Sequence, residues 1–340
     1  MKGSLQTESG ASPISTMCVS HKEDADGICS AAIVKSALQA SKVVLVDYAN
    51  LMARLEKAVS AGKHDRIVVC DLGLSKKNEK QFAEVLTGCV SDGKQVFYID
   101  HHDLNKETSS SLRKGGVNLV HTVDECTSVQ AYGLFKNELP ANAAFLAAMG
   151  ALTDYMEDRP TAARLVQKFD RQFLMLEATS LSYMISANQH HDEFLVKLVD
   201  TLSKMKFPHD VRDGFEIAER YAKKVAHAVE TIRDQIVPLE NLAYAPSTVE
   251  LSASMVVNFV LGASEKPAAM VYKLKDDINS YVFSIRGASN CKVHLGRLVN
   301  EIATGLGGSG GGHDRACGAV VPKDKLEEFV RAIDSKIDSN

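Results

Sequence analysis

The run Tyr98-Ile-Asp-His-His-Asp103 places one carboxylate and two imidazoles side by side at the end of an apolar segment. A strand interior has no use for three adjacent polar groups, whereas a divalent cation can bind all of them. Other acidic and imidazole side chains also lie at the ends of apolar segments, namely His21, Asp24, Asp26, Asp71 and Asp154. Together with Asp100, His101 and His102, they form a His/Asp set large enough for two divalent ions.

The segment Ser20-His-Lys-Glu-Asp-Ala-Asp-Gly27 carries three of these candidates. Asp24 and Asp26 repel each other unless a cation lies between them, and Gly27 lets the backbone turn tightly before the next helix. The alternative is that Asp26 simply caps a helix that begins at Ile28. The segment alone leaves both interpretations open, and the Asp-His-His run favours the metal.

Asp71 and Asp154 are isolated carboxylates. Asp71 follows the apolar segment 66–70, where it could be an ordinary turn residue. In a two-metal centre, one carboxylate normally bridges ions that lie about 3.5–4 Å apart. Asp71 is the best candidate for the bridge because its strand is central. Asp154 lies in an apolar helix of small residues, 144–156, where an unpaired charge is costly to bury. It either lies at the helix end in water or faces a cation, and we favour the cation.

Two further segments have competing interpretations. The glycine-dense segment 305–313 is either a flexible linker or a loop whose N–H groups approach an anion, with His313 as a donor to phosphate. It lacks the Lys-Ser/Thr ending of a nucleotide P-loop. Gln189-His-His-Asp192 repeats the letters of the first run, but no strand precedes it, and we interpret it as a solvated helix face.

Strand-like and helix-like segments alternate from about residue 15 to 155. The expected strands are 16–19, 42–46, 66–70, 94–99 and 117–120, and the expected helices are 28–38, 51–59 and 79–86. This alternation predicts a mostly parallel sheet with helices on both faces. Ligands of such sheets bind outside the carboxyl ends of the strands. Since His21, Asp71 and Asp100 fall at such ends, we expect them to meet in space.

The remainder predicts a helical region, 141–236, and then a smaller α/β domain. Its expected strands are 255–260, 268–272, 281–285 and 318–321, and its expected helices are 293–303 and 323–337. The fold class is therefore α/β, with an N-terminal doubly wound sheet, a helical linker and a smaller C-terminal α/β domain. We place a disordered tail at 1–13, the metal-binding catalytic domain at 14–185, the linker at 186–240 and the substrate-binding domain at 241–340.

Composition limits the function classes. Of 340 residues, 45% are hydrophobic and 24% are charged, which is typical of soluble globular proteins. A net charge of −4 argues against non-specific binding of long nucleic acid. The seven cysteines have no Cys-x-x-Cys spacing and predict buried thiols in a reducing compartment. No segment approaches the roughly 20 apolar residues of a membrane span. We expect a cytoplasmic protein that does not contact membranes.

In this order and spacing, the residues resemble the DHH phosphoesterase superfamily, in its DHH–DHHA1 branch. The resemblance covers nearly the whole chain after the tail. It rests on His21-x-x-Asp24-x-Asp26-Gly27, Asp71, Asp100-His101-His102 and Asp154, followed by Ser284-Ile-Arg286 and Gly310-Gly-Gly-His313. Any one of these is weak evidence, whereas the ordered set is strong.

The resemblance implies a dinuclear centre that usually holds two Mn²⁺, with Mg²⁺ as the alternative. His21, Asp24 and Asp71 would hold one ion, and the second would be held by Asp26, Asp71, His101 and Asp154. Asp100 would support the site and His102 would face the substrate phosphate. The second domain would bind substrate through Ser284, Arg286, Gly310, Gly311, Gly312 and His313.

Two departures from the superfamily pattern stand out. Glu23 occupies a position where many members carry proline, and the spacing after His21 is shorter, as in archaeal and RecJ-like members. The glycine segment before His313 is longer than usual.

The expected function is a phosphodiesterase or exonuclease that hydrolyses short oligonucleotides, like nanoRNases, with water activated by two metals. The alternatives are a RecJ-like single-strand exonuclease and a phosphoesterase for dinucleotides or 3′-phosphoadenosine phosphate. A catalytically inactive replication scaffold is less favoured because every proposed ligand is an intact His or Asp. Expected partners are short RNA or DNA oligonucleotides or dinucleotides. A homodimer and a replication or repair protein are further partners that we consider.

Overall fold

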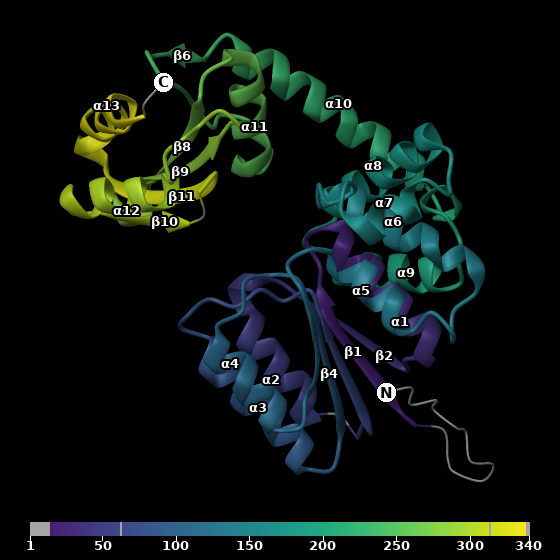
Figure 1. Cartoon of the computed structure of the whole chain (residues 1–340). Helices are drawn as coiled ribbons and strands as arrows, with labels where there is room; N and C mark the ends of the chain where they lie inside the picture. The colour runs from purple at the N-terminus through teal and green to yellow at the C-terminus, as the bar shows by residue number, and fades with distance from the viewer. Residues whose placement is uncertain (1–13, 62, 313, 338–340) are drawn as a thin grey trace. The chain divides into compact units, whose positions relative to one another are not determined.

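The computed structural model describes residues 14–61, 63–312 and 314–337, so the predicted tail, 1–13, lies outside the described residues. The chain forms two compact units, and the boundary between Tyr221 and Ala222 falls inside one long helix, α10 (Gly214–Arg233) (Figure 1). Each unit has its own sheet.

The N-terminal unit is built on a five-stranded parallel sheet. Its strands are β1 (Thr16–His21), β2 (Lys42–Val46), β3 (Arg66–Cys70), β4 (Gln95–Asp100) and β5 (Asn118–His121). The strand order is β2-β1-β3-β4-β5, and every neighbouring pair is parallel. The predicted parallel sheet is confirmed.

Helices cover both faces of this sheet (Figure 1). One face carries α2 (Leu51–Ala61), α3 (Glu79–Ser91) and α4 (Lys106–Lys114), and the other carries α1 (Ala25–Leu38), α5 (Thr127–Leu134) and α6 (Ala144–Thr153). Each face of the sheet has its own hydrophobic core. Within β3, Ile67 and Val69 belong to the core under α2, α3 and α4, whereas Val68 and Cys70 belong to the core under α1, α5 and α6. Both faces of the strand are apolar because both are covered.

In the strand order, β1 and β3 are neighbours although β2 lies between them in the chain. The chain leaves β1 through α1 on one face, and it leaves β3 through α3 on the opposite face. The carboxyl ends of β1 and β3 are therefore neighbours whose following segments diverge, which is where doubly wound sheets bind ligands. His21 ends β1, Asp71 follows β3 and Asp100 ends β4.

The middle of the chain is helical, as predicted. It contains α7 (Pro160–Val166), α8 (Arg171–Ala187), α9 (Asp192–Ser203) and α10. Helix α8 packs against α6, and α9 packs against α1. The expected linker, 186–240, thus includes a helix that belongs to the core of the N-terminal unit. Among the described residues, no helix has both the length and the apolar character needed to cross a membrane.

The C-terminal unit has a six-stranded mixed sheet in the order β10-β11-β9-β8-β7-β6. Within this sheet, the β7–β8 pair is parallel and the other described pairs are antiparallel. The strands are β6 (Val237–Pro238), β7 (Leu242–Pro246), β8 (Ala268–Lys275), β9 (Ser280–Gly287), β10 (Ser309–Gly312) and β11 (Ala316–Pro322). Helices α12 (Leu295–Gly305) and α13 (Leu326–Lys336) cover one face, and α11 (Ala253–Ser264) covers the other. The predicted α/β class of this domain is confirmed.

One predicted strand is a helix. Residues 255–260 lie within α11, where Ser252 caps the helix and its hydroxyl accepts the N–H of Met255 at 3.3 Å. Val256, Val257 and Val260 are buried, and their spacing places them on one side of the helix. Periodicity alone does not separate a short buried helix from a strand.

The glycine-dense segment is also more ordered than predicted. Its residues 309–312 form β10, which pairs antiparallel with β11. Gly311 and Gly312 have φ values of 153° and 138°, which residues other than glycine rarely adopt. Glycine therefore lets this segment pair as a strand that a bulkier sequence would distort.

The seven cysteines are buried and unpaired, in agreement with the predicted buried thiols.

Replacing Gly27 with alanine should destabilise the N-terminal unit by about 1–3 kcal/mol. A Cβ at this position would lie 2.5 Å from the carbonyl oxygen of His21, where backbone must shift. The matched control is Gly88→Ala in α3, where a Cβ would meet nothing within 4 Å. That control should gain roughly 0.5–1 kcal/mol because alanine favours a helix interior. Chemical denaturation of both variants measures the difference, and equal effects would contradict the close approach.

Candidate metal centre

The first part of the site lies where β1 passes into α1. Asp24 is the N-cap of α1, and its Oδ1 accepts the N–H of Gly27 at 2.9 Å. Its Oδ2 lies 2.8 Å from Nδ1 of His21. The cap thus fixes one carboxylate oxygen and directs the other toward His21.

Asp26 is not the helix cap, so that alternative interpretation was wrong. It lies in the first turn of α1 and is 1% exposed. Its two carboxylate oxygens accept the N–H groups of Thr127 at 2.8 Å and Ser128 at 2.9 Å. These residues begin α5, and such N–H groups have no partner within their own helix. The start of α5 therefore holds the Asp26 carboxylate in place.

Asp71 lies between two histidines. Its backbone adopts a left-handed conformation, with φ 57°, directly after β3, and its side chain is 1% exposed. Oδ1 lies 3.5 Å from Nε2 of His101, and Oδ2 lies 3.8 Å from Nδ1 of His21. The Thr127 hydroxyl donates to Oδ1 at 3.0 Å.

Asp154 lies at the end of a helix that is shorter than the predicted 144–156, because α6 ends at Thr153 and Asp154 is its C-cap. Its Oδ2 is buried and accepts no hydrogen bond from the described residues. The same oxygen lies 3.4 Å from Nε2 of His101. A buried carboxylate oxygen without a donor is the feature that a cation would satisfy.

Asp100 and His102 form a pair beside these groups. The buried Asp100 carboxylate accepts the N–H of His102 at 3.0 Å, and its other oxygen lies 3.1 Å from Nδ1 of His102. The hydroxyl of Tyr48 lies 3.4 Å from Nε2 of His102. The Tyr48 ring also lies 4.6 Å from the His21 ring, measured between centroids. Tyr48 therefore contacts the histidine that ends β1 and a histidine that follows β4.

Three groups in the described part of the chain could each hold a metal ion, and within each group the ligand atoms lie within 4.8 Å of one another. The groups are His21/Asp24/Asp71, Asp26/His101/Asp154 and Asp71/His101/His102. Asp71 belongs to two of them. Oxygen and imidazole donors without thiolate suit Mn²⁺ or Mg²⁺, so the residues fit the expected metal.

Several supporting residues were missed by the sequence reasoning. Thr127 and Ser128 follow Glu125-Cys126 and begin a helix. Two adjacent polar residues at a helix start are a sequence feature that could have indicated a role in the site. The Gln130 amide donates to the carbonyl of Asp100 at 3.1 Å. The His121 ring donates to the carbonyl of His102 at 2.6 Å. Nothing in the sequence marked Tyr48.

Asp192 forms ion pairs with residues of other segments, so the interpretation of residues 189–192 as a solvated helix face was wrong for this residue. Its carboxylate lies 3.0 Å from the Lys22 ammonium and 2.5 Å from the Arg54 guanidinium. Lys22 also pairs with Asp47 at 3.2 Å. These ion pairs connect the loop after β1 to α2 and α9, whereas His190 and His191 are exposed as expected.

The crowded charges shift the proton affinities of the site. Burial and the charge of Asp71 raise the pKa of Asp26 to about 6, and burial and Asp26 raise the pKa of Asp154 to about 8. Burial opposes the charged form of His101, but Asp71 and the neighbouring carboxylates raise its pKa to about 10. Burial likewise opposes ionised Asp71, yet His101 and His21 hold its pKa well below its usual range. Protons thus partly neutralise the metal-free site.

The C-terminal candidates lie on the β9–β11–β10 part of the second sheet. Ser284 of β9 and Gly311 of β10 both pair with Gly318 of β11. The Arg286 guanidinium donates to the Ser254 hydroxyl at 3.1 Å. Asn300 of α12 donates to the Gly310 carbonyl at 2.6 Å.

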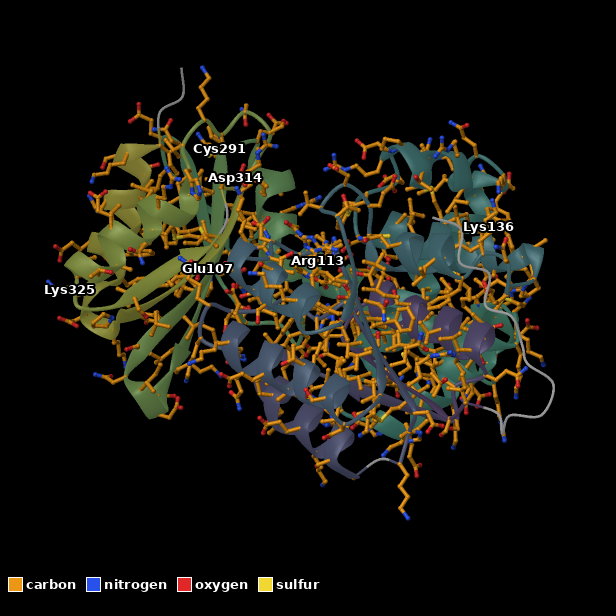
Figure 2. The ribbon with its side chains drawn as sticks, turned by 60° about the horizontal axis from the view of Figure 1, so that its bottom comes forward. Glu107, Arg113, Lys136, Cys291, Asp314 and Lys325 are labelled. Atoms are coloured by element: carbon orange, nitrogen blue, oxygen red, sulfur yellow. The ribbon has the colours of Figure 1, made fainter. Side chains whose placement is uncertain are left out.

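His313 lies outside the described residues, so its predicted role stays a prediction. Asp314, which follows it, lies close to Cys291 (Figure 2), and the Asp314 carbonyl accepts the N–H of Leu295 at 2.9 Å. The chain after position 313 is therefore anchored at the start of α12.

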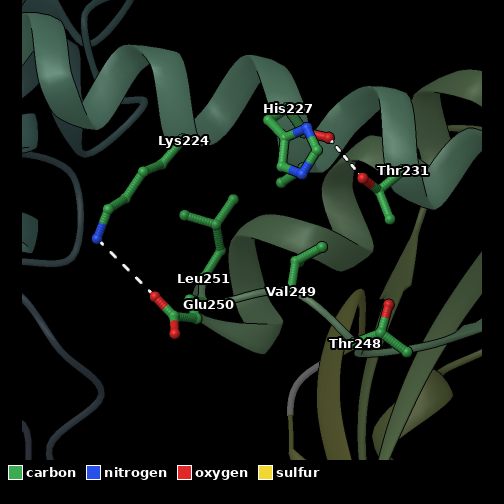
Figure 3. Close-up of a pocket in the computed structure, with 8 residues that line it drawn as sticks. Lys224, His227, Thr231, Thr248, Val249, Glu250 and Leu251 are labelled. Atoms are coloured by element: carbon green, nitrogen blue, oxygen red, sulfur yellow. Dashed lines mark hydrogen bonds and ion pairs between the residues drawn. The ribbon is translucent and has the colours of Figure 1, made fainter.

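A small hollow of about 290 Å³ lies elsewhere in the C-terminal unit, between α10 and the segment before α11 (Figure 3). Lys224 and Glu250 form an ion pair of 3.9 Å beside it, and His227 lines it. It has no group of His and Asp side chains comparable to the metal-ligand groups among its described lining residues. We therefore assign the candidate chemistry to the N-terminal unit.

Mn²⁺ binding at pH 7 should release protons into solution. The ion needs neutral His101 and ionised Asp154, whereas the raised pKa values leave both largely protonated in the metal-free protein. The apparent affinity should therefore rise as the pH increases from 6 toward 9. Calorimetry in buffers of different ionisation enthalpy measures the protons released per ion. Binding that releases no protons and does not depend on pH would contradict this charge state.

Sequence models of two domain families match the chain. The DHH family, N-terminal domain, matches residues 15–151, and the DHHA1 domain matches residues 243–339. Two proteins of Methanocaldococcus jannaschii are related by sequence. Uncharacterized protein MJ0831 is 28% identical over 179 residues, which are 51% of this chain and only 38% of MJ0831. Uncharacterized protein MJ0988 is 24% identical over 250 residues, 70% of each chain.

Solved structures share the fold at low sequence identity. A pGpG-specific phosphodiesterase from Vibrio cholerae has a TM-score of 0.61 and 12% identity, with 95% of this chain and 98% of that chain covered. The DHH domain of a member of a ribosomal protein family has a TM-score of 0.68 and 13% identity, with 96% and 88% covered. An exopolyphosphatase-related protein from Bacteroides fragilis has a TM-score of 0.55 and 13% identity, with 95% and 91% covered. With both domain matches in this order, the chain belongs to the DHH–DHHA1 superfamily.

Proposed function

We propose that this protein is a metal-dependent phosphodiesterase that shortens small oligonucleotides. The observation that carries the proposal is the position of Asp71, which lies between His21 on one side and His101 on the other. One carboxylate shared by two ligand groups is what a dinuclear centre requires. The intact ligand set argues against an inactive scaffold.

The ligand assignment follows from the three groups. His21, Asp24 and Asp71 would hold one ion, and Asp26, Asp71, His101 and Asp154 would hold the other. When bound, two such ions stabilise negative charge on the attacking and leaving oxygens of an in-line displacement at phosphorus. Mn²⁺ or Mg²⁺ suits these donors.

The protein's own residues would orient the substrate. Asp100 accepts the Nδ1–H of His102, which leaves Nε2 free to contact a phosphate oxygen. The Tyr48 hydroxyl, 3.4 Å from that nitrogen, offers a second hydrogen-bonding group at the same place. The start of α5 fixes Asp26 through two N–H groups, so this ligand does not have to reorganise on binding.

The substrate class rests on the DHHA1 domain and on charge. Arg286 and His313 would hold a terminal phosphate or nucleotide, supported by the backbone of Gly310, Gly311 and Gly312 and by Ser284. A net charge of −4 does not favour long nucleic acid. A shared fold with a pGpG-specific phosphodiesterase supports a short substrate as well. The alternatives are a RecJ-like exonuclease and a phosphoesterase acting on dinucleotides or 3′-phosphoadenosine phosphate.

Digestion of end-labelled RNA and DNA ladders, from the dinucleotide to about a 30-mer, tests this function. With Mn²⁺, the protein should cleave the shortest species fastest, and chelation of the metal should stop the reaction. Asp71→Ala should abolish cleavage while the fold remains intact, because the shared ligand is gone. Fastest cleavage of the longest strands would favour the exonuclease alternative. Full activity of Asp71→Ala would refute the bridging role.

Loss of the terminal-phosphate contacts should affect large and small substrates differently. Arg286→Ala and His313→Ala should each lower kcat/KM for a short oligonucleotide by roughly 10-fold or more, because each removes a hydrogen bond between charged groups that contributes about this much to binding. Cleavage of bis-p-nitrophenyl phosphate, which has no terminal phosphate, should change little. Arg331→Ala on the exposed side of α13 is the matched control and should match the unmodified protein. An equal loss on both substrates would mean that the second domain does not bind the oligonucleotide.

A further inference from the structure

The two ring nitrogens of His21 face different surroundings. Nδ1 lies 2.8 Å from Oδ2 of Asp24 and 3.8 Å from Oδ2 of Asp71, so it faces one of the three candidate metal-ligand groups. Nε2 lies 3.4 Å from Oε2 of Glu23. The ring itself is buried, with 5% of the side chain exposed, and the Tyr48 ring lies 4.6 Å from it. The imidazole is therefore enclosed, with one nitrogen directed inward and the other toward Glu23.

A histidine that binds a metal through one nitrogen carries its proton on the other. That N–H usually donates to a carboxylate or carbonyl, which fixes the tautomer and the ring orientation and makes the metal-bound nitrogen more basic. In this chain, Glu23 is the carboxylate next to the outward nitrogen of His21.

We propose that Glu23 is a positioning residue for the metal ligand His21: it accepts the Nε2–H and so keeps Nδ1 unprotonated for the ion. The proposal rests on the metal centre of the proposed function and not on its substrate. It gives a role to the glutamate that stands where many members of the superfamily carry proline.

Two other roles for Glu23 are less consistent with its surroundings. Glu23 belongs to none of the three ligand groups found among the described residues, and 42% of its side chain is exposed, so it is not itself placed as a ligand. The neighbouring cation, Lys22, pairs instead with Asp47 at 3.2 Å and Asp192 at 3.0 Å. Within the described ranges, His21 is the one ion-pair partner found for Glu23.

Mn²⁺ titration by calorimetry on the full chain tests the proposal. Glu23→Ala should weaken one of the two binding events by roughly 10-fold to 100-fold and leave the other within about 2-fold, the size expected when a carboxylate partner of a metal-bound histidine is lost. Glu23→Gln keeps an oxygen that accepts the Nε2–H, so it should weaken the same event less than Glu23→Ala does. Glu84→Gln, an exposed glutamate of α3 that pairs with Lys80 at 3.8 Å, is the charge-matched control and should bind like the unmodified protein. Equal affinities of Glu23→Ala and the control would overturn the proposal.

The tautomer of His21 gives a second readout. In ¹⁵N-histidine-labelled protein loaded with diamagnetic Mg²⁺, long-range nitrogen–proton spectra should show His21 protonated at Nε2 and unprotonated at Nδ1. Glu23→Ala should broaden or remove the Nε2–H signal. A proton on Nδ1 of His21 in the metal-loaded protein would contradict the proposal directly.

These outcomes separate the two proposals. A chain that binds no Mn²⁺ would overturn both. A chain that binds two ions, one of them dependent on Glu23, but cleaves no oligonucleotide would overturn the proposed substrate alone.

Discussion

Mutual repulsion among buried carboxylates is the constraint on which the N-terminal unit depends. Asp26 and Asp71 are each 1% exposed, and Asp154 has a buried oxygen without a hydrogen-bond donor among the described residues. Burial of several negative charges in one place is very unfavourable unless positive charge accompanies them. His21 and His101 supply part of this positive charge beside Asp71, and the N–H groups at the start of α5 donate hydrogen bonds to Asp26. Divalent cations would supply the rest and displace the protons.

The sheet explains why these side chains meet. Parallel strands bring their carboxyl ends to one edge, and the order β2-β1-β3-β4-β5 makes β1, β3 and β4 neighbours. His21, Asp71 and Asp100 are thereby adjacent without any specific contact between distant loops. Helix α1 begins beside this edge and carries Asp26 in its first turn, while the end of α6 adds Asp154. The fold thus brings ligands from five separate segments to one place.

Much of this arrangement could be predicted from sequence because its causes are local. The alternation of strand-like and helix-like segments predicted the parallel sheet, and the Asp and His residues at the strand ends predicted the meeting of His21, Asp71 and Asp100. The contacts that fix the site could not be predicted. Asp26 is held by Thr127 and Ser128, which are 101 and 102 residues away in sequence, and only the folded chain brings them together. Tyr48 contacts His102 from a short 3-10 helix, Tyr48–Asn50, whose sequence has no distinctive pattern.

The errors of prediction have a common physical origin. Residues 255–260 contain a run of apolar side chains that fits either a buried strand or one face of a helix. The N-cap at Ser252, which accepts the N–H of Met255, favours the helix. Asp192 was interpreted from its polar neighbours, yet it pairs with Lys22, which is 170 residues earlier in the chain. In both cases the missing information was a tertiary partner or a cap rather than a local propensity.

The most direct test of the central claim is anomalous diffraction from crystals grown with Mn²⁺. Two anomalous peaks should lie about 3.5–4 Å apart, one beside His21 and Asp24 and the other beside His101 and Asp154, with Asp71 between them. A structure at saturating Mn²⁺ with no peak among these residues, or with the peaks elsewhere on the protein, would contradict the account.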